Sequence, residues 1–562
     1  MTLPNTIATA LTLTIVASLS GCGKPDDGPS AETTNSEPAS APFELADASG
    51  LESYSHETGA AGKFWFPESM GPGVGVIDYN SDGLPDVLVA GGGRWDNSKW
   101  KSVWLFRNEG DLTFTDVTDE AGLAPASTYS MGVTVADYDR DGREDFLLTS
   151  VGGVRLYRNA GGTFVDATRD AGLSVDDGWS TAASFFDGDA DGDLDLLIGH
   201  YVSWTAETDL WCSNDGTDKT YCTPSLYEGE PLTYYRNDGG RFVDGTARAG
   251  FDAGDGKTLG IVAGDVTGDG IVDVYVANDT EPDQLFRGDG SGKFEEIGLQ
   301  SGIAYDERGR SRAGMGVDIG DIDGSGKASL VVGNFAEEMI GVYQPVGGGI
   351  YTDRSAAVKI GMPSLRTLTF GLALVDVDLD GSLDLVAANG HIQPEIGRIR
   401  DNVTFAEPPH VFLNDGSGAF YDGVAAGSDL ARPMVARGLA YADLDRDGDP
   451  ELLFVENSGT VRLWKNDAVE NGAKGVVVQL RREDAASPAI DALVELYSGG
   501  KILRRWVKSG GSYLSSSQPA AFFGVAGVVD SIRVVSPGGA TTSIRNVEDL
   551  LADGPVVTVR VQ

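Results

Sequence analysis

Dense groups of acidic residues recur along the chain at one fixed spacing. The stretch from Asp137 to Asp145 reads DYDRDGRED, with acidic side chains at positions 1, 3, 5 and 9 and a glycine at position 6. Calcium takes six to eight oxygen ligands, and a short acidic loop with a tight glycine turn can wrap around it. Without a cation, two charges about 4 Å apart repel by about 4 kcal/mol at an effective dielectric constant of 20. The stretch therefore predicts a calcium loop.

The same pattern occurs seven times, which a solvated acidic turn does not explain. An EF-hand is disfavoured, because its bidentate glutamate stands at position 12 and its flanks are helical. The position-6 glycine is expected to adopt a positive φ. The predicted ligands are, loop by loop, Asp78, Asn80, Asp82 and Asp86; Asp137, Asp139, Asp141 and Asp145; Asp187, Asp189, Asp191 and Asp195; Asp265, Thr267, Asp269 and Asp273; Asp321, Asp323 and Ser325; Asp376, Asp378, Asp380 and Asp384; and Asp443, Asp445, Asp447 and Glu451.

These loops differ in charge. Four of them, which begin at Asp137, Asp187, Asp376 and Asp443, carry a carboxylate at every ligand position. The loop at Asp321 keeps only two carboxylates and contains a lysine, Lys327. The predicted cofactor is Ca²⁺ at up to seven sites, with the site at Asp321 weak or empty.

Short apolar strands must position the loops. One precedes and one follows each loop, and segments such as VWLFRNEG and FTDVTDEAGL complete four-strand units that repeat about every 61 residues. Such units are typical of propeller blades. The seventh unit lacks its fourth strand, whereas an unassigned strand at 43–51 precedes the first loop, so pairing of the two would close a ring. The predicted fold is all-β, with a seven-bladed β-propeller at 43–467 and a small β-domain at 474–562.

The charge balance limits the possible partners. The chain has 85 Asp and Glu residues against 42 Lys and Arg, a formal net charge of −43. Nucleic acid is excluded as an expected partner, because phosphate binding needs a basic surface. Residues 474–562 instead carry a net charge of about +2. Within them, Arg504, Arg505 and Lys508 are interpreted as solvated charges, the alternative being that they face the acidic propeller or an acidic ligand.

The N-terminal sequence predicts export. ALTLTIVASLSGC, ending at Cys22, resembles a bacterial lipobox, which implies a signal peptide at 1–21 and lipid modification of Cys22. An ordinary cleaved signal is the alternative. Residues 22–42 are polar and read as a flexible acidic tether. We expect a monomer at the outer membrane or cell surface, held to the membrane only by its lipid.

Two further cysteines lie in a polar loop, WCSNDGTDKTYCTP. In an oxidising compartment Cys212 and Cys222 are predicted to form a disulfide. A metal site is the alternative, although no histidine or other cysteine stands nearby to complete its ligands.

The repeating units resemble FG-GAP/VCBS repeats, the calcium-loop propeller units also seen in integrin α chains. Residues 475–548 resemble the ASPIC/UnbV domain through IDALVELYSGG, RRWVKSGGSYLSSSQPAAFFGVA and DSIRVVSPGGATTSIRNV. Together the chain is similar to bacterial members of the cartilage acidic protein family. Two positions depart from that family: IDA replaces its usual Gly-Ala-Arg, and SPGG stands where Trp-Pro-Xaa-Gly is common.

Two classes of function follow. The first is a surface binding or adhesion module for a protein or a glycan. If the calcium loops join strands one and two, the loops after strand two lie on the opposite face. The longest, 199–231, supplies the predicted partner-binding residues Tyr201, Trp204, Trp211, Tyr221 and Tyr227. The alternative is that these aromatic residues pack beneath their own loop.

The second class is a calcium-dependent polysaccharide lyase or hydrolase, or an accessory subunit of one. Against it, the four histidines are scattered, and no nucleophile triad, zinc motif or nucleotide loop is apparent. His391 in NGHIQPE is the best catalytic candidate, but a structural role at a strand end is preferred. No catalytic residue is therefore predicted.

Overall fold

The computed structural model describes residues 40–561 except 97, 175–177, 307 and 484–487. The predicted signal peptide, the predicted lipid modification of Cys22 and residues 22–39 of the predicted tether lie outside these residues. The rest of the chain is all-β, as predicted. No helix in the described part is long and apolar enough to cross a membrane.

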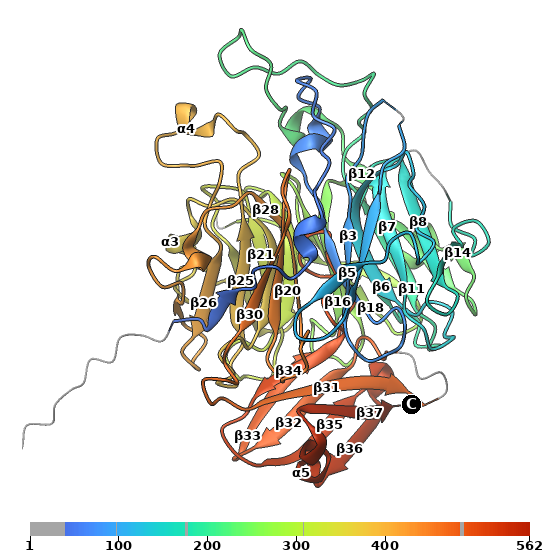
Figure 1. Ribbon diagram of the computed structural model, residues 1–562, viewed down its shortest axis with the longest axis vertical. Helices are drawn as coiled ribbons and strands as arrows, with labels where there is room; N and C mark the ends of the chain where they lie inside the picture. The colour runs from blue at the N-terminus through green and yellow to red at the C-terminus, as the bar shows by residue number, and fades with distance from the viewer. Residues whose placement is uncertain (1–39, 97, 175–177, 307, 484–487, 562) are drawn as a thin grey trace, which may run out of the picture. The chain divides into compact units, whose positions relative to one another are not determined.

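Seven four-stranded antiparallel sheets form the part of the chain that precedes the C-terminal domain (Figure 1). The first six are β2 (Val74–Ile77), β3 (Asp86–Ala90), β4 (Val103–Asn108) and β5 (Phe114–Asp116); β6 (Tyr129–Ala136), β7 (Asp145–Val151), β8 (Gly153–Asn159) and β9 (Phe164–Asp166); β10 (Ser180–Phe186), β11 (Asp195–His200), β13 (Thr233–Asn237) and β14 (Phe242–Asp244); β16 (Thr258–Gly264), β17 (Asp273–Asn278), β18 (Gln284–Gly288) and β19 (Phe294–Glu296); β20 (Gly314–Gly320), β21 (Ser329–Asn334), β22 (Gly341–Gly347) and β23 (Ile350–Asp353); and β24 (Thr369–Val375), β25 (Asp384–Asn389), β26 (His410–Asn414) and β27 (Phe420–Asp422). The seventh joins β28 (Ala436–Ala442), β29 (Glu451–Glu456) and β30 (Val461–Asn466) to β1 (Phe43–Leu45).

The two ends of the ring meet in the seventh sheet. Strand β1 pairs antiparallel with β30, with Phe43 opposite Asn466 and Leu45 opposite Trp464. This is the closure that the missing fourth strand predicts. The first strands of successive sheets contact one another, and β28 also contacts β2. These sheets therefore form a closed propeller-like ring.

The first strand of each sheet in the ring is rich in small residues because the first strands of neighbouring sheets pack closely together. All seven residues of β16 and of β20 are buried. A Cβ atom added at Gly260 would lie only 2.0 Å from the carbonyl oxygen of Met315 on the next sheet. Side chains of ordinary size would not fit at such positions.

The C-terminal residues form a separate β-domain with its own apolar core. Its strands are β31 (Gly475–Arg482), β34 (Ala520–Gly524) and β37 (Val556–Val561) in one sheet, and β33 (Lys501–Trp506), β32 (Leu493–Ser498), β35 (Val529–Val535) and β36 (Thr541–Arg545) in the other. Strands β31 and β37 are parallel, whereas the other pairs in this domain are antiparallel.

Helical segments are short and lie in connections. They are α1 (Thr246–Ala249), α2 (Gly298–Ser301), α3 (Gly361–Ser364), α4 (Ile396–Ile399) and α5 (Val547–Leu550), with 3₁₀ turns η1 (Leu51–Ser53), η2 (Phe66–Ser69), η3 (Pro224–Leu226), η4 (Asp429–Ala431), η5 (Pro537–Gly539) and η6 (Leu551–Asp553). A two-stranded ribbon, β12 (Glu230–Pro231) with β15 (Asp255–Gly256), completes the regular structure.

The connection between β33 and β34 leaves the C-terminal domain and enters the centre of the ring. Gly510 bridges to Val262, Ser512 to Val317 and Ser516 to Gly75, which are all on innermost strands. Between them, Tyr513 is fully buried, and its hydroxyl donates to the carbonyl of Met70 at 3.0 Å. We call residues 508–518 the plug segment. It explains why the centre of the ring has room only for small residues.

Candidate metal centres

Each acidic loop joins the first and second strands of its sheet. In all seven loops, the position-1 carboxylate accepts a hydrogen bond from the backbone N–H of the position-6 glycine, for example Gly142 to Asp137 at 2.8 Å. The glycine φ values run from 81° at Gly326 to 105° at Gly448. The expected positive φ is therefore confirmed.

Position 4 also adopts a positive φ in every loop, which the sequence analysis missed. The residues there are Ser81, Arg140, Ala190, Gly268, Gly324, Leu379 and Arg446. Two of the seven are glycines, and this was the available signal.

The position-9 side chain is held at the start of the second strand. Asp145 is buried and accepts the backbone N–H groups of Tyr138 at 3.2 Å and Asn159 at 2.7 Å, one on each carboxylate oxygen. Each oxygen keeps one lone pair for a cation. This residue is thus fixed in place before any ion binds.

An asparagine in the third strand links neighbouring loops, a role not predicted. The side-chain amide of Asn159 donates to the Glu144 carbonyl in its own loop at 3.2 Å and to the Tyr79 carbonyl in the preceding loop at 2.8 Å. Asn108, Asn237, Asn414 and Asn466 make the equivalent pairs of bonds. Their signal was the Asn that recurs at the end of the third strand, as in VWLFRNEG.

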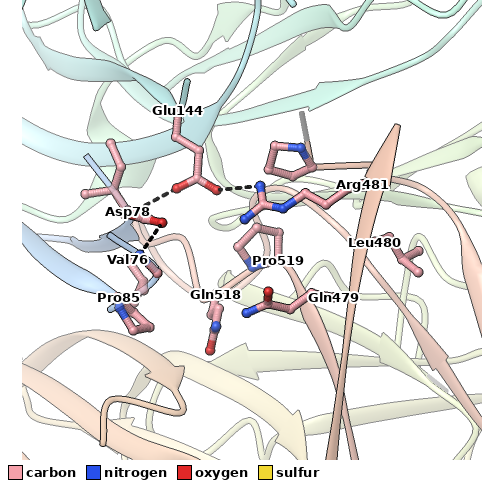
Figure 2. Close-up of a pocket in the computed structure, with 12 residues that line it drawn as sticks. Val76, Asp78, Pro85, Glu144, Gln479, Leu480, Arg481, Gln518 and Pro519 are labelled. Carbon is pink, nitrogen blue, oxygen red and sulfur yellow. Dashed lines mark hydrogen bonds and ion pairs between the residues drawn. The ribbon is translucent and has the colours of Figure 1, made fainter. Parts of the chain in front are cut away.

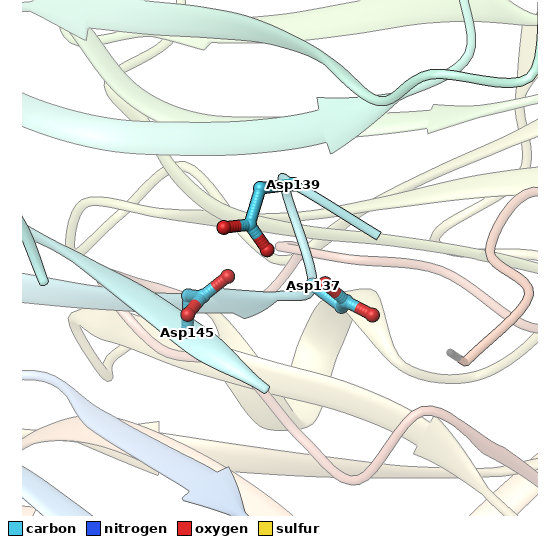
Figure 3. A group of neighbouring side chains, drawn as sticks. All are labelled: Asp137, Asp139 and Asp145. Carbon is cyan, nitrogen blue, oxygen red and sulfur yellow. The ribbon is translucent and has the colours of Figure 1, made fainter. Parts of the chain in front are cut away.

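Carboxylates come close together in the four loops predicted to be richest in charge. Among the described residues, the groups whose oxygen atoms lie within 4.8 Å of one another are Asp137, Asp139 and Asp145; Asp187, Asp189 and Asp191; Asp376, Asp378 and Asp384; Asp443, Asp445 and Glu451; and Asp447, Asp449 and Glu451. Figure 3 shows the first group, whose three carboxylates lie close together. Asp449, at position 7, was not predicted.

Several predicted ligands carry a buried oxygen that has no hydrogen-bond partner. These atoms are Asp139 Oδ1, Asp187 Oδ1, Thr267 Oγ1, Asp321 Oδ1, Asp376 Oδ1 and Asp443 Oδ2. A buried, unsatisfied polar atom costs about 1–3 kcal/mol. A cation bound within the loop would satisfy them, so the residues present fit Ca²⁺.

Burial raises the pKa values of the carboxyl groups at positions 1 and 9, and neighbouring carboxylates raise them further. The pKa is raised to about 8 at Asp86 and to about 9 at Asp145. Groups with a raised pKa in the folded state bind more protons there than in the unfolded chain, so folding loses stability as pH rises through the folded pKa.

We therefore expect the free energy of unfolding of the metal-free protein to fall between pH 6 and pH 9. With saturating CaCl₂ the decline should be small, because the bound ion stabilises the ionised form. Urea denaturation at both pH values, with and without Ca²⁺, measures this. A metal-free protein that grew more stable toward pH 9 would contradict the prediction.

The fifth loop differs from the others in its charge. Ser325 and Ser329 stand where every other loop carries a carboxylate at positions 5 and 9, which leaves Asp321 and Asp323 as its only predicted carboxylate ligands. Arg504 Nη1 of the C-terminal domain lies 3.7 Å from Asp321 Oδ2, and Lys327 is exposed. A loop with two carboxylates beside an arginine is expected to bind Ca²⁺ weakly or to stay empty.

The C-terminal domain covers the face that carries these loops. Arg505, only 7% exposed, donates to Asp376 Oδ2 at 3.2 Å, which also accepts the N–H of Gly524 at 2.8 Å. Lys508 pairs with the buried Asp318 at 2.8 Å. The interpretation of Arg504, Arg505 and Lys508 as solvated charges is therefore wrong. They face the acidic propeller, because its buried carboxylates there need cationic partners.

A small cavity of about 40 Å³ lies between the first two loops and the C-terminal domain. Figure 2 shows Glu144 between two partners: it accepts the backbone N–H of Asp78 at 2.7 Å, and its other oxygen lies 4.0 Å from Arg481. Loading of the loops and docking of the C-terminal domain therefore involve the same segments.

The opposite face carries the long loop after β11. Cys212 and Cys222 form a disulfide, with Cα atoms 5.3 Å apart, as predicted. Tyr201, Trp204 and Tyr227 are buried in an aromatic cluster, so for these three predicted partner-binding residues the alternative of packing beneath their own loop is confirmed. They pack beneath their own loop because the ring has apolar side chains there to cover.

Of the two other aromatic residues in this loop, only Trp211 is largely exposed, at 61%. Tyr221 is partly buried, and its hydroxyl donates to Glu68 at 3.2 Å. His391 is buried, and its Nδ1 accepts the N–H of Gln393 at 3.0 Å. Burial lowers the pKa of His391 to about 4, in keeping with the structural role preferred for it.

Comparison with known proteins identifies the repeats and the C-terminal domain. The FG-GAP-like repeat model matches residues 78–148, 139–198, 265–332 and 376–454, and the ASPIC and UnbV model matches 483–549. The ring and its loops thus define an FG-GAP repeat protein with a C-terminal ASPIC and UnbV domain. Both families are generally non-catalytic and suggest an extracellular binding module.

Among curated proteins, the chain is distantly homologous to cartilage acidic protein 1. It is 25% identical to the Xenopus tropicalis protein over 289 residues, which cover 50% of this chain and 42% of the relative. It is 27% identical to the Mus musculus protein over 255 residues, which cover 42% and 35%. The matched region thus spans less than half of each of these relatives.

Solved structures match at lower identity. One describes recognition of non-reducing terminal N-acetylglucosamine by an Agrocybe aegerita lectin, with 18% identity, coverage of 64% of this chain and 81% of the other, and a TM-score of 0.39. Another is BBS1N in complex with ARL6DN, with 12% identity, coverage of 76% and 98%, and a TM-score of 0.40.

Proposed function

We propose that this chain is an exported, lipid-anchored calcium-binding propeller that serves as a binding module for a protein or glycan partner. The buried, unpartnered oxygens at the predicted ligand positions support calcium binding most directly. The C-terminal domain covers the loop face, so partner recognition is assigned to the opposite face.

The binding function is preferred over a polysaccharide lyase or hydrolase. Catalysis by His391 would require an accessible imidazole, whereas this side chain is buried among Gln393, Phe335 and Arg437. The acidic loops are explained by ion binding and by docking of the C-terminal domain. No observation of the described residues specifically favours catalysis.

Two matched substitutions test the calcium assignment. Asp378→Ala removes the position-3 oxygen ligand of a four-carboxylate loop, whereas Asp323→Ala makes the same change in the fifth loop. We expect Asp378→Ala to reduce the number of bound Ca²⁺ ions by about one and Asp323→Ala to leave it unchanged. Equilibrium dialysis with ⁴⁵Ca²⁺ counts them. Equal stoichiometry in all three proteins would argue against the loop at Asp376 as a calcium site.

A further inference from the structure

A cavity of about 360 Å³ opens beside the long 199–231 loop, on the face opposite the metal loops. Residues 57–68 and 94–96 form it, and neither segment contains a predicted metal ligand or partner-binding residue. Its size falls within the roughly 300–1,000 Å³ range of small-ligand sites. Its walls include two partly exposed tryptophans, Trp65 and Trp95.

The tryptophans are held rigidly before any ligand arrives. Their ring centroids lie 5.3 Å apart at an interplanar angle of 89°. The ring of Trp95 stacks on that of the buried Tyr129, with centroids 4.4 Å apart. The buried Trp204 of the 199–231 loop contacts both tryptophans. Rings fixed in this way lose little conformational entropy when a ligand packs on them. The buried aromatic residues of 199–231 thus act as a support for this cavity.

The polar groups of the cavity have unused hydrogen-bonding capacity. Glu68 is only 2% exposed, and its Oε1 has no hydrogen-bond partner, while Oε2 accepts the Tyr221 hydroxyl. Burial raises the pKa of Glu68 to about 7, with Asp209 raising it and Lys219 lowering it. A buried carboxyl oxygen without a partner in such a cavity is suited to accept a donor from a ligand.

Charged side chains of both signs line the cavity around Glu68. Glu57 and Asp96 line the cavity together with Arg94 and Lys63, and Arg94 Nε pairs with Glu57 at 3.0 Å. An anionic ligand would meet the carboxylates. A cationic ligand would meet Lys63, whose Nζ already lies 4.4 Å from the centroid of the Trp65 ring. A purely apolar ligand would desolvate the ion pair without compensation.

A neutral sugar ring satisfies all of these groups at once. Its hydroxyl groups donate to the carboxylates and accept from the cations, and its C–H face packs on an indole ring. We propose that this cavity binds a neutral carbohydrate. The inference rests on the proposed function and names the ligand class of its partner-binding face.

Titration calorimetry of the Ca²⁺-loaded full chain tests the proposal, using neutral hexasaccharides of glucose, mannose, galactose, xylose and N-acetylglucosamine. At least one should bind. Trp65→Ala and Glu68→Gln should each weaken binding by about tenfold or more, as for buried contacts at the centre of a site. Leu226→Ala, at an exposed position on the neighbouring loop and outside the cavity lining, is the control and should bind as the parent does, whereas Trp211→Ala tests the tip of that loop. Melting temperatures establish that the variants fold. If Trp65→Ala does not fold, binding by the near-isosteric Glu68→Gln variant tests the proposal by itself.

Two results would overturn the proposal. Binding lost in Trp211→Ala but kept in Trp65→Ala and Glu68→Gln would place the site on the loop tip, leaving the module function intact. Absence of binding to all five sugars would reject carbohydrate as the ligand class. The calcium stoichiometry test is independent of both, so failure of the metal assignment is distinguishable from failure of this site.

Discussion

Removal of calcium should strongly destabilise the propeller. An ion that binds only the folded state at a free concentration 100 times its Kd stabilises it by about 2.7 kcal/mol. Two filled loops therefore correspond to about 5 kcal/mol, and for a folded chain of this size the melting temperature should fall by about 5 °C on chelation, and by more if further loops are filled. The physical reason is that converging carboxylates such as Asp137, Asp139 and Asp145 then repel one another without compensation.

Differential scanning calorimetry of the full chain before and after dialysis against EGTA measures this effect. Restoring Ca²⁺ should restore the original transition. Mg²⁺ should restore less of it, because Mg²⁺ demands near-octahedral geometry and retains its water ligands. An identical transition with and without chelation would sink the structural role of calcium.

Loss of the plug segment's aromatic ring should also destabilise the whole molecule. Tyr513 is fully buried at the centre of the ring, and its ring packs edge-on against Phe370 at 4.8 Å. Truncation of a buried aromatic side chain costs about 3–5 kcal/mol, so Tyr513→Ala should lower the free energy of unfolding by about that amount. Tyr513→Phe keeps the ring and loses only the bond to Met70, at about 1 kcal/mol.

Tyr497 provides the matched control in the same domain. It is only partly buried on β32, where its hydroxyl donates to Glu495 at 2.9 Å. Tyr497→Ala should therefore cost clearly less than Tyr513→Ala in urea denaturation of the full chain. If the two alanine variants were equally stable, the plug segment would not hold the ring and the C-terminal domain together.

Much of the metal-loop face was predictable because its determinants are local. Positions 1, 3, 5, 6 and 9 lie within nine residues, and backbone sterics at Gly142 and its equivalents limit the turn that they form. Closure was predictable for a related reason. An unpaired strand at one end of a repeat array and a missing strand at the other leave β1 and β30 as natural partners.

The interpretation of the basic residues as solvated charges was wrong because their partners are far away in the sequence. Arg505 and Asp376 are 129 residues apart, and no spacing in the sequence shows that β33 faces the sixth loop. Which aromatic residues of 199–231 are exposed could not be predicted for a similar reason. An exposed and a buried tryptophan on an irregular loop have the same local sequence signals, and only contacts such as that of Trp204 with Trp65 decide between them.

The sequence by itself determined the repeat, the all-β class, the ring closure and the carboxylate pattern of each acidic loop, because regular spacing records local backbone geometry. Tertiary structure alone decided which surfaces meet. The C-terminal domain lies over the acidic loops. The plug segment lies inside the ring, where Tyr513 bonds to Met70, a residue 443 positions earlier in the chain. Trp65, Trp95 and Glu68 line one cavity. Such contacts depend on the shape and charge of surfaces far apart in the chain, which leave no periodic trace in it.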